Sequence, residues 1–167
     1  FTDDRNVLVV KPDGAEIVRT KKYDNKDNLQ ITKGSCVVNE KGDLLADLTM
    51  VSEGATYNEK YRLPEKSQTD KEAHYKENWS HIGNLKINEV AFENDRRNVR
   101  FTEKLKLGAA NYGAVSGNKM LLVVNAFDPY GENIKRIRNR KTPFLVHRGF
   151  YDTDEIALEL PTGFAIE

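Results

Sequence analysis

Several residue classes are scarce in this sequence, and each shortage excludes a class of protein. Among 167 residues there is one cysteine, Cys36, which rules out a disulfide within the chain and leaves no paired cysteines for a zinc site. The longest apolar run, residues 120–124, is far shorter than the ~20 residues that cross a bilayer. Twenty-six basic residues balance twenty-six acidic ones, so no net charge draws the chain to nucleic acid or an anionic membrane.

Motifs for catalysis and metal binding are also missing. The sequence has no glycine-rich phosphate loop and no Gly-x-Ser-x-Gly nucleophile turn. His74 and His81 are seven residues apart, whereas a helical zinc pair needs a spacing of about four. Cys36 falls in a predicted strand, where no helix N-terminus lowers its pKa, and we interpret it as a buried structural thiol. We therefore predict no catalytic residue, metal or cofactor in this chain.

What remains is mainly the pattern of β-strands. Residues 7–10 and 17–20 flank the turn Pro12-Asp13-Gly14, in which proline presets φ and glycine takes positive φ, and they predict a hairpin. In residues 29–38 the apolar positions change parity midway, which predicts a bulge near Gly34. Each strand thus has one apolar face for a core.

Further strands follow in the middle of the chain. Residues 44–57 and 99–109 both alternate apolar and polar side chains, and a phase change within residues 85–92 predicts another bulge. Glu103 falls on the apolar face of its strand, so it is either a rim carboxylate with a hydrogen-bonding partner or a functional acid. Residues 120–124 are apolar on both faces, as in a strand covered on both sides.

One amphipathic helix interrupts the strands. Thr69 and Glu72 form a capping-box pattern, and three large apolar residues follow on one face: Tyr75, Trp79 and Ile82. The pattern predicts a helix over about residues 69–82 that lies across an open sheet face with Trp79 as its anchor.

The end of the chain holds its most distinctive string, residues 140–160. Residues 143–148 and 155–160 have the composition of strands, and an acidic link, residues 152–155, joins them. About ten strands with a single helix predict an antiparallel β-sandwich spanning residues 1–167 as one domain, with a closed barrel as the alternative. We expect this domain to be a fragment of a larger protein.

One surface has the composition of a binding site. Basic and aromatic residues gather between residues 127 and 148 and have the composition of a surface for nucleic acid or an acidic polysaccharide. The neutral net charge favours the alternative, in which the basic residues form ion pairs with the acidic residues 152–155. The candidate binding residues are Phe127, Tyr130, Arg136, Arg138, Arg140 and Arg148.

Four strings resemble the region after the catalytic core in the large transglutaminase-like proteins of Bacteroides-type bacteria, which belong to the papain-like cysteine protease superfamily. The strings are FTDDR (residues 1–5), DKEAHYKENW (70–79), the stretch from NY to NAF (111–127), and RNRKTP through RGFYD (138–152). The resemblance implies a C-terminal β region of unknown function preceded by a Cys-His-Asp core. It also implies a periplasmic or cell-surface location.

Three functions follow from these observations. The resemblance favours a non-catalytic accessory domain that packs against the catalytic core of the same protein or presents substrate to it. The basic and aromatic surface favours an adhesion-type module that binds glycan or protein. The third is a hydrolase that uses Glu103 with Asp152 and Asp154 as general acid and base, which requires one pocket to join these acids.

Overall fold

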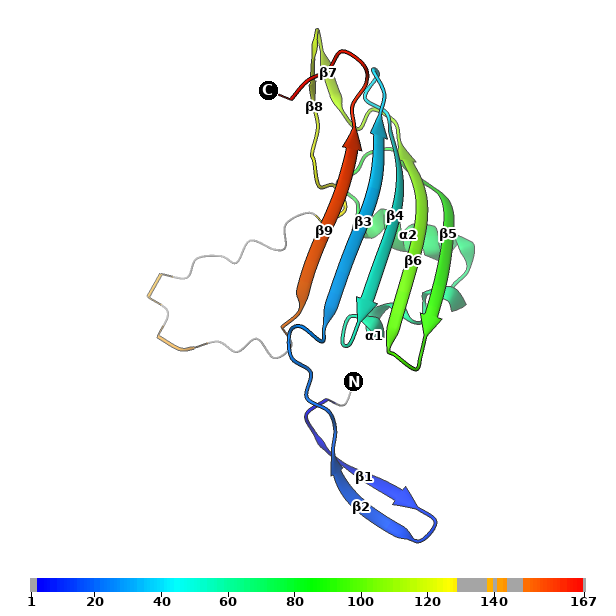
Figure 1. Cartoon of the computed structure of the whole chain (residues 1–167), viewed down its shortest axis with the longest axis vertical. Helices are drawn as coiled ribbons and strands as arrows, with labels where there is room; N and C mark the ends of the chain where they lie inside the picture. The colour runs from blue at the N-terminus through cyan, green and yellow to red at the C-terminus, as the bar shows by residue number, and fades with distance from the viewer. Residues whose placement is uncertain (1–2, 129–137, 140, 144–148, 167) are drawn as a thin grey trace.

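The chain is mainly β, as the sequence predicts. The computed structural model describes residues 3–128, 138–139, 141–143 and 149–166, and its main sheet has five strands in the order β5-β6-β4-β3-β9 (Figure 1). These strands are β3 (Leu29–Val38), β4 (Leu44–Glu53), β5 (Leu85–Asp95), β6 (Arg100–Ala109) and β9 (Tyr151–Glu159). Neighbouring strands run antiparallel, except that β9 lies parallel to β3.

Two short hairpins accompany the main sheet. The first pairs β1 (Asn6–Lys11) with β2 (Gly14–Arg19), which confirms the hairpin predicted around Pro12-Asp13-Gly14. The second pairs β7 (Ala114–Ser116) with β8 (Lys119–Leu121). The strand predicted over residues 120–124 ends at Leu121, and the predicted cover on both of its faces is wrong, because Leu121, Val123 and Val124 are all exposed.

The helical segment is shorter and begins earlier than predicted. It consists of α1 (Tyr57–Lys60), the 3-10 turn η1 (Leu63–Glu65) and α2 (Gln68–Asn78). Ser67, not Thr69, caps α2: its hydroxyl oxygen accepts a hydrogen bond from the backbone N–H of Asp70 and donates one to the Asp70 carboxylate. Trp79 and Ile82 lie beyond the last helical residue but are buried, so the predicted anchor is confirmed.

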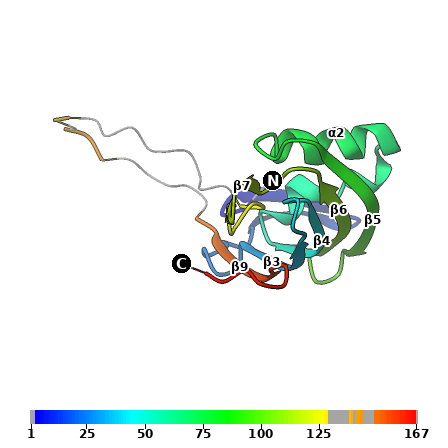
Figure 2. The same cartoon turned by 90° about the horizontal axis from the view of Figure 1, so that it is seen from above.

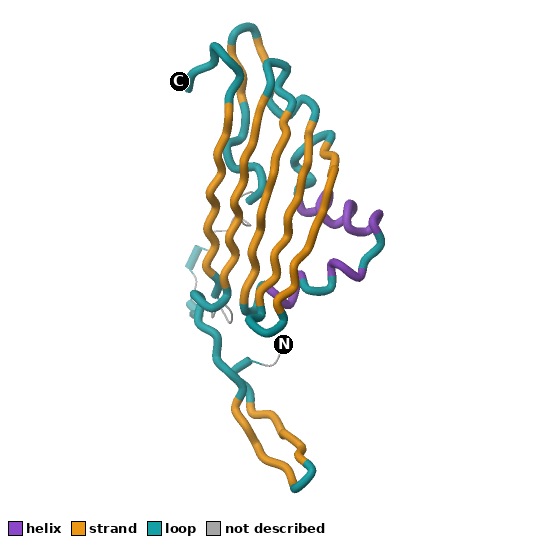
Figure 3. The backbone as a smooth tube through the Cα atoms, turned by 45° about the vertical axis from the view of Figure 1, so that its right-hand side comes forward, coloured by secondary structure: helices purple, strands orange, loops and turns teal. Residues whose placement is uncertain are grey.

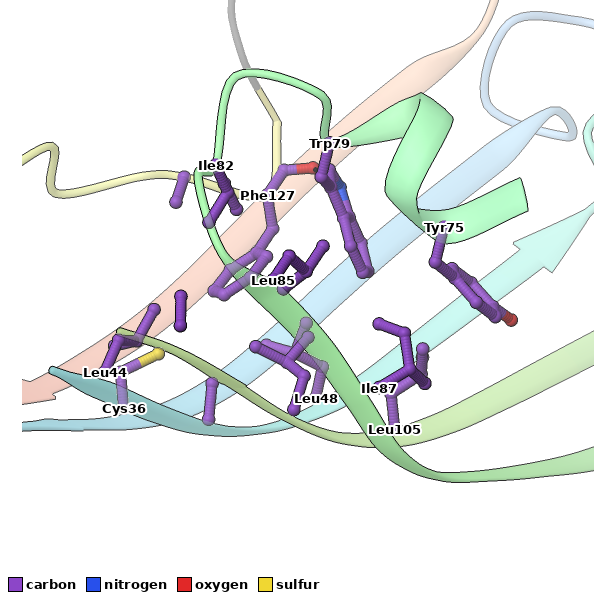
Figure 4. Packing of buried hydrophobic residues seen from close by; sticks show 14 of the residues in the cluster. Cys36, Leu44, Leu48, Tyr75, Trp79, Ile82, Leu85, Ile87, Leu105 and Phe127 are labelled. Carbon is purple, nitrogen blue, oxygen red and sulfur yellow. Dashed lines mark hydrogen bonds between the residues drawn. The ribbon is translucent and has the colours of Figure 1, made fainter. Parts of the chain in front are cut away.

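The arrangement is sandwich-like, with one face of the main sheet buried beneath a second layer. Helix α2 and residues 120–127 cover this face, and the helix is seen crossing the curved sheet in Figure 2. Trp79 and Phe127 pack above Leu48 and Leu105 of the sheet (Figure 4). The Trp79 and Phe127 rings meet edge to face at 5.3 Å, a favourable geometry for an aromatic pair.

The opposite face of the main sheet is polar and exposed. Cross-strand ion pairs lie along it, joining Lys33 to Glu155, Lys106 to Glu89 and Lys104 to Glu93. Each pair is more than half exposed and so contributes little to stability. The high content of charged residues in the sequence is therefore partly explained by one solvated sheet face.

Two strand predictions need correction. β3 pairs with β4 without any register shift, so the bulge predicted near Gly34 is absent. The apolar residues Leu29 and Ile31 lie on the exposed side of the strand, and polar residues take the inner positions.

β9 begins at Tyr151, so the acidic residues predicted to form a link lie within the strand. The bulge predicted in residues 85–92 is confirmed between Ile87 and Glu89. The strand predicted over residues 143–148 stays a prediction, because residues 144–148 lie outside the described residues.

Candidate functional site

The inner face of the main sheet changes from apolar to polar along the strands. Across β6, β4, β3 and β9, one row of paired residues is Leu107, Ala46, Cys36 and Leu158, all apolar. Two rows nearer the other end hold most of the polar residues that face inward. We call these residues the polar half: Gln30, Thr32, Ser52, Glu103, Asp152 and Asp154.

Glu103 is the most deeply buried member of the polar half, with 0% of its surface exposed. The hydroxyl of Tyr75, from α2, donates a hydrogen bond of 2.5 Å to its Oε2 atom, and the ammonium of Lys60, from α1, lies 3.0 Å from its Oε1 atom. Burial and the nearby carboxylate of Glu103 raise the pKa of Tyr75, so the phenol keeps its proton and acts as a donor. This buried triad, Glu103 with Tyr75 and Lys60, joins both helices to β6.

A pocket of about 260 Å³ opens beside the buried triad. Its lining combines aromatic rings, a thioether, two amides and an ammonium group, contributed by Gln30, Met50, Lys60, Tyr75, Asn78, Trp79 and Phe127. Much of its hydrogen-bonding capacity is already used, since Trp79 donates to the Phe127 carbonyl and Gln30 donates to Asp152. The pocket is smaller than the ~300–1,000 Å³ of sites for drug-sized molecules, and its lining contains no thiol or carboxylate.

Three aspartates gather at the β9 side of the polar half. The amide of Gln30 donates to Asp152 at 3.3 Å, and the amide of Asn125 donates to Asp154 at 2.7 Å. The pKa of Asp128 is raised mainly by burial and also by the charge of Asp154. The pKa of Asp152 is likewise raised mainly by burial and also by the charge of Asp128. These acids repel one another at neutral pH.

The described residues bring no group of three or more histidine, cysteine, aspartate or glutamate side chains close enough to hold a metal ion. Glu103 and Asp154 occupy the same row of the sheet but are three strand spacings apart, with Met50 and Thr32 between them. That spacing is ~14 Å between Cα atoms, and the pocket beside the triad is not lined by either acid. The geometry therefore does not join Glu103 to Asp152 and Asp154 in one pocket, as the hydrolase hypothesis requires.

Cys36 lies in the apolar half of the inner face, with 3% of its surface exposed. Burial is the main reason that its pKa is raised, and the charge of Asp47 adds to the effect. A raised pKa disfavours the thiolate that a nucleophile needs. His74 hydrogen-bonds to Asn78 within α2, and His81, just beyond this helix, hydrogen-bonds to the carbonyl of Ala126.

The predicted binding residues are not all placed. Phe127 is 6% exposed and belongs to the core, where its ring contacts Trp79. Arg138 is exposed. The other four predicted residues lie outside the described residues: Tyr130, Arg136, Arg140 and Arg148. The sequence does not identify Lys60 and Gln30 as residues of this site, because nothing in their spacing distinguishes them from other polar residues. Glu103 could be identified, because it lies on an otherwise apolar strand face.

The β1–β2 hairpin forms an apolar arm that projects past the end of the main sheet (Figures 1 and 3). Leu8 pairs with Ile17, and Val10 pairs with Ala15, so these four side chains share one face of the hairpin. Leu8, Val10 and Ile17 are 65%, 77% and 74% exposed. We use the name "arm" for Asn6–Lys11 together with Gly14–Arg19.

No family model, curated protein or solved structure matches this chain. The resemblance to transglutaminase-like proteins therefore stays a prediction. Within the described ranges, no helix is long and apolar enough to cross a membrane.

Proposed function

We propose that this chain is a non-catalytic accessory β domain that packs against the catalytic core of a transglutaminase-like protein and helps to present substrate to it. The observation that carries this proposal is the arm, which exposes a continuous apolar face made by Leu8, Val10, Ala15 and Ile17. The location that accompanies it, periplasmic or cell-surface, rests on the sequence resemblance.

The energetics of the arm favour a docking role. A two-stranded hairpin is at best marginally stable in water, because it has no further layer on which to bury its side chains. The ion pairs Lys11–Glu16 and Arg19–Asp4 are exposed and contribute little. Burying a Leu, Val or Ile side chain contributes about 1.5–3 kcal/mol, so three such residues are a substantial source of binding free energy.

The arm also has the composition of the apolar centre of an interface. Charged residues are depleted at the centre of a typical interface and concentrated at its rim. The charged pair Lys11–Glu16 lies on the opposite face of the hairpin, whereas Arg19, paired with Asp4, lies at the base of the face that carries Leu8 and Ile17. This distribution fits a docking element that lays one apolar face against the partner and keeps its charged pairs at the base and on the back.

The test compares binding of this chain and its variants to the separately purified catalytic core by calorimetry. Leu8→Asp and Ile17→Asp each place a charge on the apolar face, and we expect each to weaken binding at least tenfold. Leu45→Asp is the matched control, since Leu45 is a 62% exposed leucine on the polar face of β4. We expect it to change the affinity less than twofold.

Two results would overturn the proposal. One is a parent gene that encodes no Cys-His-Asp core upstream of Phe1. The other is a core that binds the wild-type chain and both arm variants equally well, or that has full activity and substrate affinity without any binding to this domain.

A further inference from the structure

β9 forms one edge of the main sheet and is unusually regular for an edge strand. It pairs with β3 over nine residues, from Tyr151 to Glu159, without a register shift, and no other described strand pairs with it. The opposite edge strand, β5, is interrupted by a bulge between Ile87 and Glu89, which is a common protection against unwanted pairing. β9 has no bulge, proline or glycine.

The direction of the β9 backbone groups follows from one hydrogen bond. The N–H of Tyr151 donates to the carbonyl of Asn28, so the backbone groups of the odd-numbered residues face β3. Because these groups alternate sides along a strand, those of the even-numbered residues face the open edge. The edge thus presents the N–H and C=O groups of Asp152, Asp154, Ile156 and Leu158, a row that an extended peptide can pair with.

The side chains of these same four residues point to the inner face, and all four are half-buried. Asp152 and Asp154 form an acidic stretch, and Ile156 and Leu158 form an apolar stretch that packs against the core. Atom Oδ1 of each aspartate is buried and has no hydrogen-bond partner among the described residues. A neighbouring strand would cover the apolar pair and could place donors beside these oxygens.

Charge complementarity decides which strand would fit. If a second copy of the chain paired its β9 antiparallel and centred on Glu155, the two Glu155 side chains would face each other and each Asp152 would lie opposite Leu158. Like charges directly opposite one another are destabilising, and the aspartates would still lack a cation. A strand with basic side chains opposite the aspartates and apolar ones opposite Ile156 and Leu158 satisfies both stretches.

We propose that the open edge of β9 binds an extended peptide segment that carries Lys or Arg at two alternate positions, followed or preceded by two alternate apolar residues. The segment adds a sixth strand to the main sheet. This interaction is separate from docking through the arm, since β9 and the arm are different elements.

The test is a titration of the isotope-labelled full chain with two peptides, TKTKTVTVT and its reverse TVTVTKTKT, followed by NMR. We expect one of the two to bind, with the largest shift changes at the amides of Asp152, Asp154, Ile156 and Leu158. The double variant Asp152→Asn with Asp154→Asn should weaken binding at least tenfold. Glu155→Gln removes a carboxylate from the other face of the same strand and should change the affinity less than twofold.

Amide exchange of the free chain provides a second measurement. We expect amides of the even-numbered β9 residues to exchange faster than those of the odd-numbered ones, because only the odd-numbered ones pair with β3. Leu8→Asp should leave peptide binding intact, so failure of the arm and failure of this edge are distinguishable. The proposal is overturned if neither peptide binds, or if the double variant binds a peptide as tightly as the wild type does. It is also overturned if the amides of the even-numbered and odd-numbered β9 residues are equally protected in the free chain, or if the chain dimerises through β9.

Discussion

The hydroxyl of Tyr75 donates a 2.5 Å hydrogen bond to Oε2 of Glu103, a carboxylate with none of its surface exposed. This bond joins α2 to β6 across the interior of the sandwich-like fold. A buried charge is costly unless it is paired and hydrogen-bonded, so the stability of this half of the core depends on the two partners of Glu103.

Replacing Tyr75 with phenylalanine tests the hydrogen bond. Tyr75→Phe keeps the ring in the core but leaves Oε2 of Glu103 without its donor, and we expect it to lower the free energy of unfolding by about 1–3 kcal/mol. The control is Tyr61→Phe, because the Tyr61 hydroxyl accepts its hydrogen bond from Arg62 at the exposed surface. Urea unfolding at pH 7 measures both. Equal stability of the two variants would contradict this role of Tyr75.

Lys60 is the second partner of Glu103, and its removal tests the buried ion pair. Lys60→Met leaves a buried carboxylate without a cation, which costs about 3–5 kcal/mol in comparable pairs. Lys60 is 14% exposed and Glu103 0%, whereas the surface pair Lys104–Glu93 is 53% and 65% exposed. Lys104→Met is therefore the matched control, and we expect little change from it. Similar losses from both variants would show that Lys60 has no special role.

The acids beside β9 predict an unusual pH dependence. The pKa values of Asp128 and Asp152 are raised in the folded state, so folding is favoured by protonation of these residues. Their contribution to stability grows as the pH falls through the raised pKa values, and it is complete below ~3.9, where unfolded aspartate is protonated as well. Asp43 and Glu155 have lowered pKa values and act in the opposite sense, but only as the pH falls below ~4.

Asp128→Asn should therefore raise the urea midpoint at pH 7, and this gain should shrink as the pH approaches 4.5. Asp13→Asn, in the exposed turn of the arm, is the control and should give no such trend. A gain from Asp128→Asn that is the same at both pH values would mean that repulsion among the aspartates does not limit stability.

Gly54, just after β4, is expected to be intolerant of any side chain. Its φ of +63° is unfavourable for other residues, and an added Cβ would lie 2.3 Å from the carbonyl oxygen of Asp27. Gly117 has a similar φ of +61° but open space around it. Both alanine variants lose about 1 kcal/mol from the backbone conformation, and Gly54→Ala should lose clearly more. Equal thermal unfolding temperatures would contradict the clash.

The sequence predicted those parts of the fold in which one face of a strand or helix is uniformly apolar. Trp79 and the strand around Glu103 were placed correctly because their apolar neighbours follow a regular period. The strand over residues 29–38 was also placed correctly, but the bulge predicted near Gly34 was wrong, since the alternation of apolar residues fails where polar residues such as Thr32 face inward. A bulge was the simplest explanation of the change in parity. The actual explanation is that the polar half of the sheet places polar side chains at inner positions.

The candidate site could be predicted only in part for the same reason. Glu103 was noticed because it interrupts an apolar face, but its partners Tyr75 and Lys60 come from distant segments that only the fold brings together. The acidic segment that contains Asp152 and Asp154 has a composition typical of a loop. Its place in an edge strand depends on parallel pairing with β3, and no local sequence pattern predicts that pairing.

Hydrogen exchange of the arm tests the central claim most directly. In the free chain, we expect the amides of Val7, Val9 and Val18 to exchange rapidly, because the arm has no layer to pack on, while those of β4 and β6 exchange slowly. With the catalytic core present, the arm amides should slow at least tenfold and the amides of β4 and β6 should not change. Arm amides that exchange equally fast with and without the core would contradict the account.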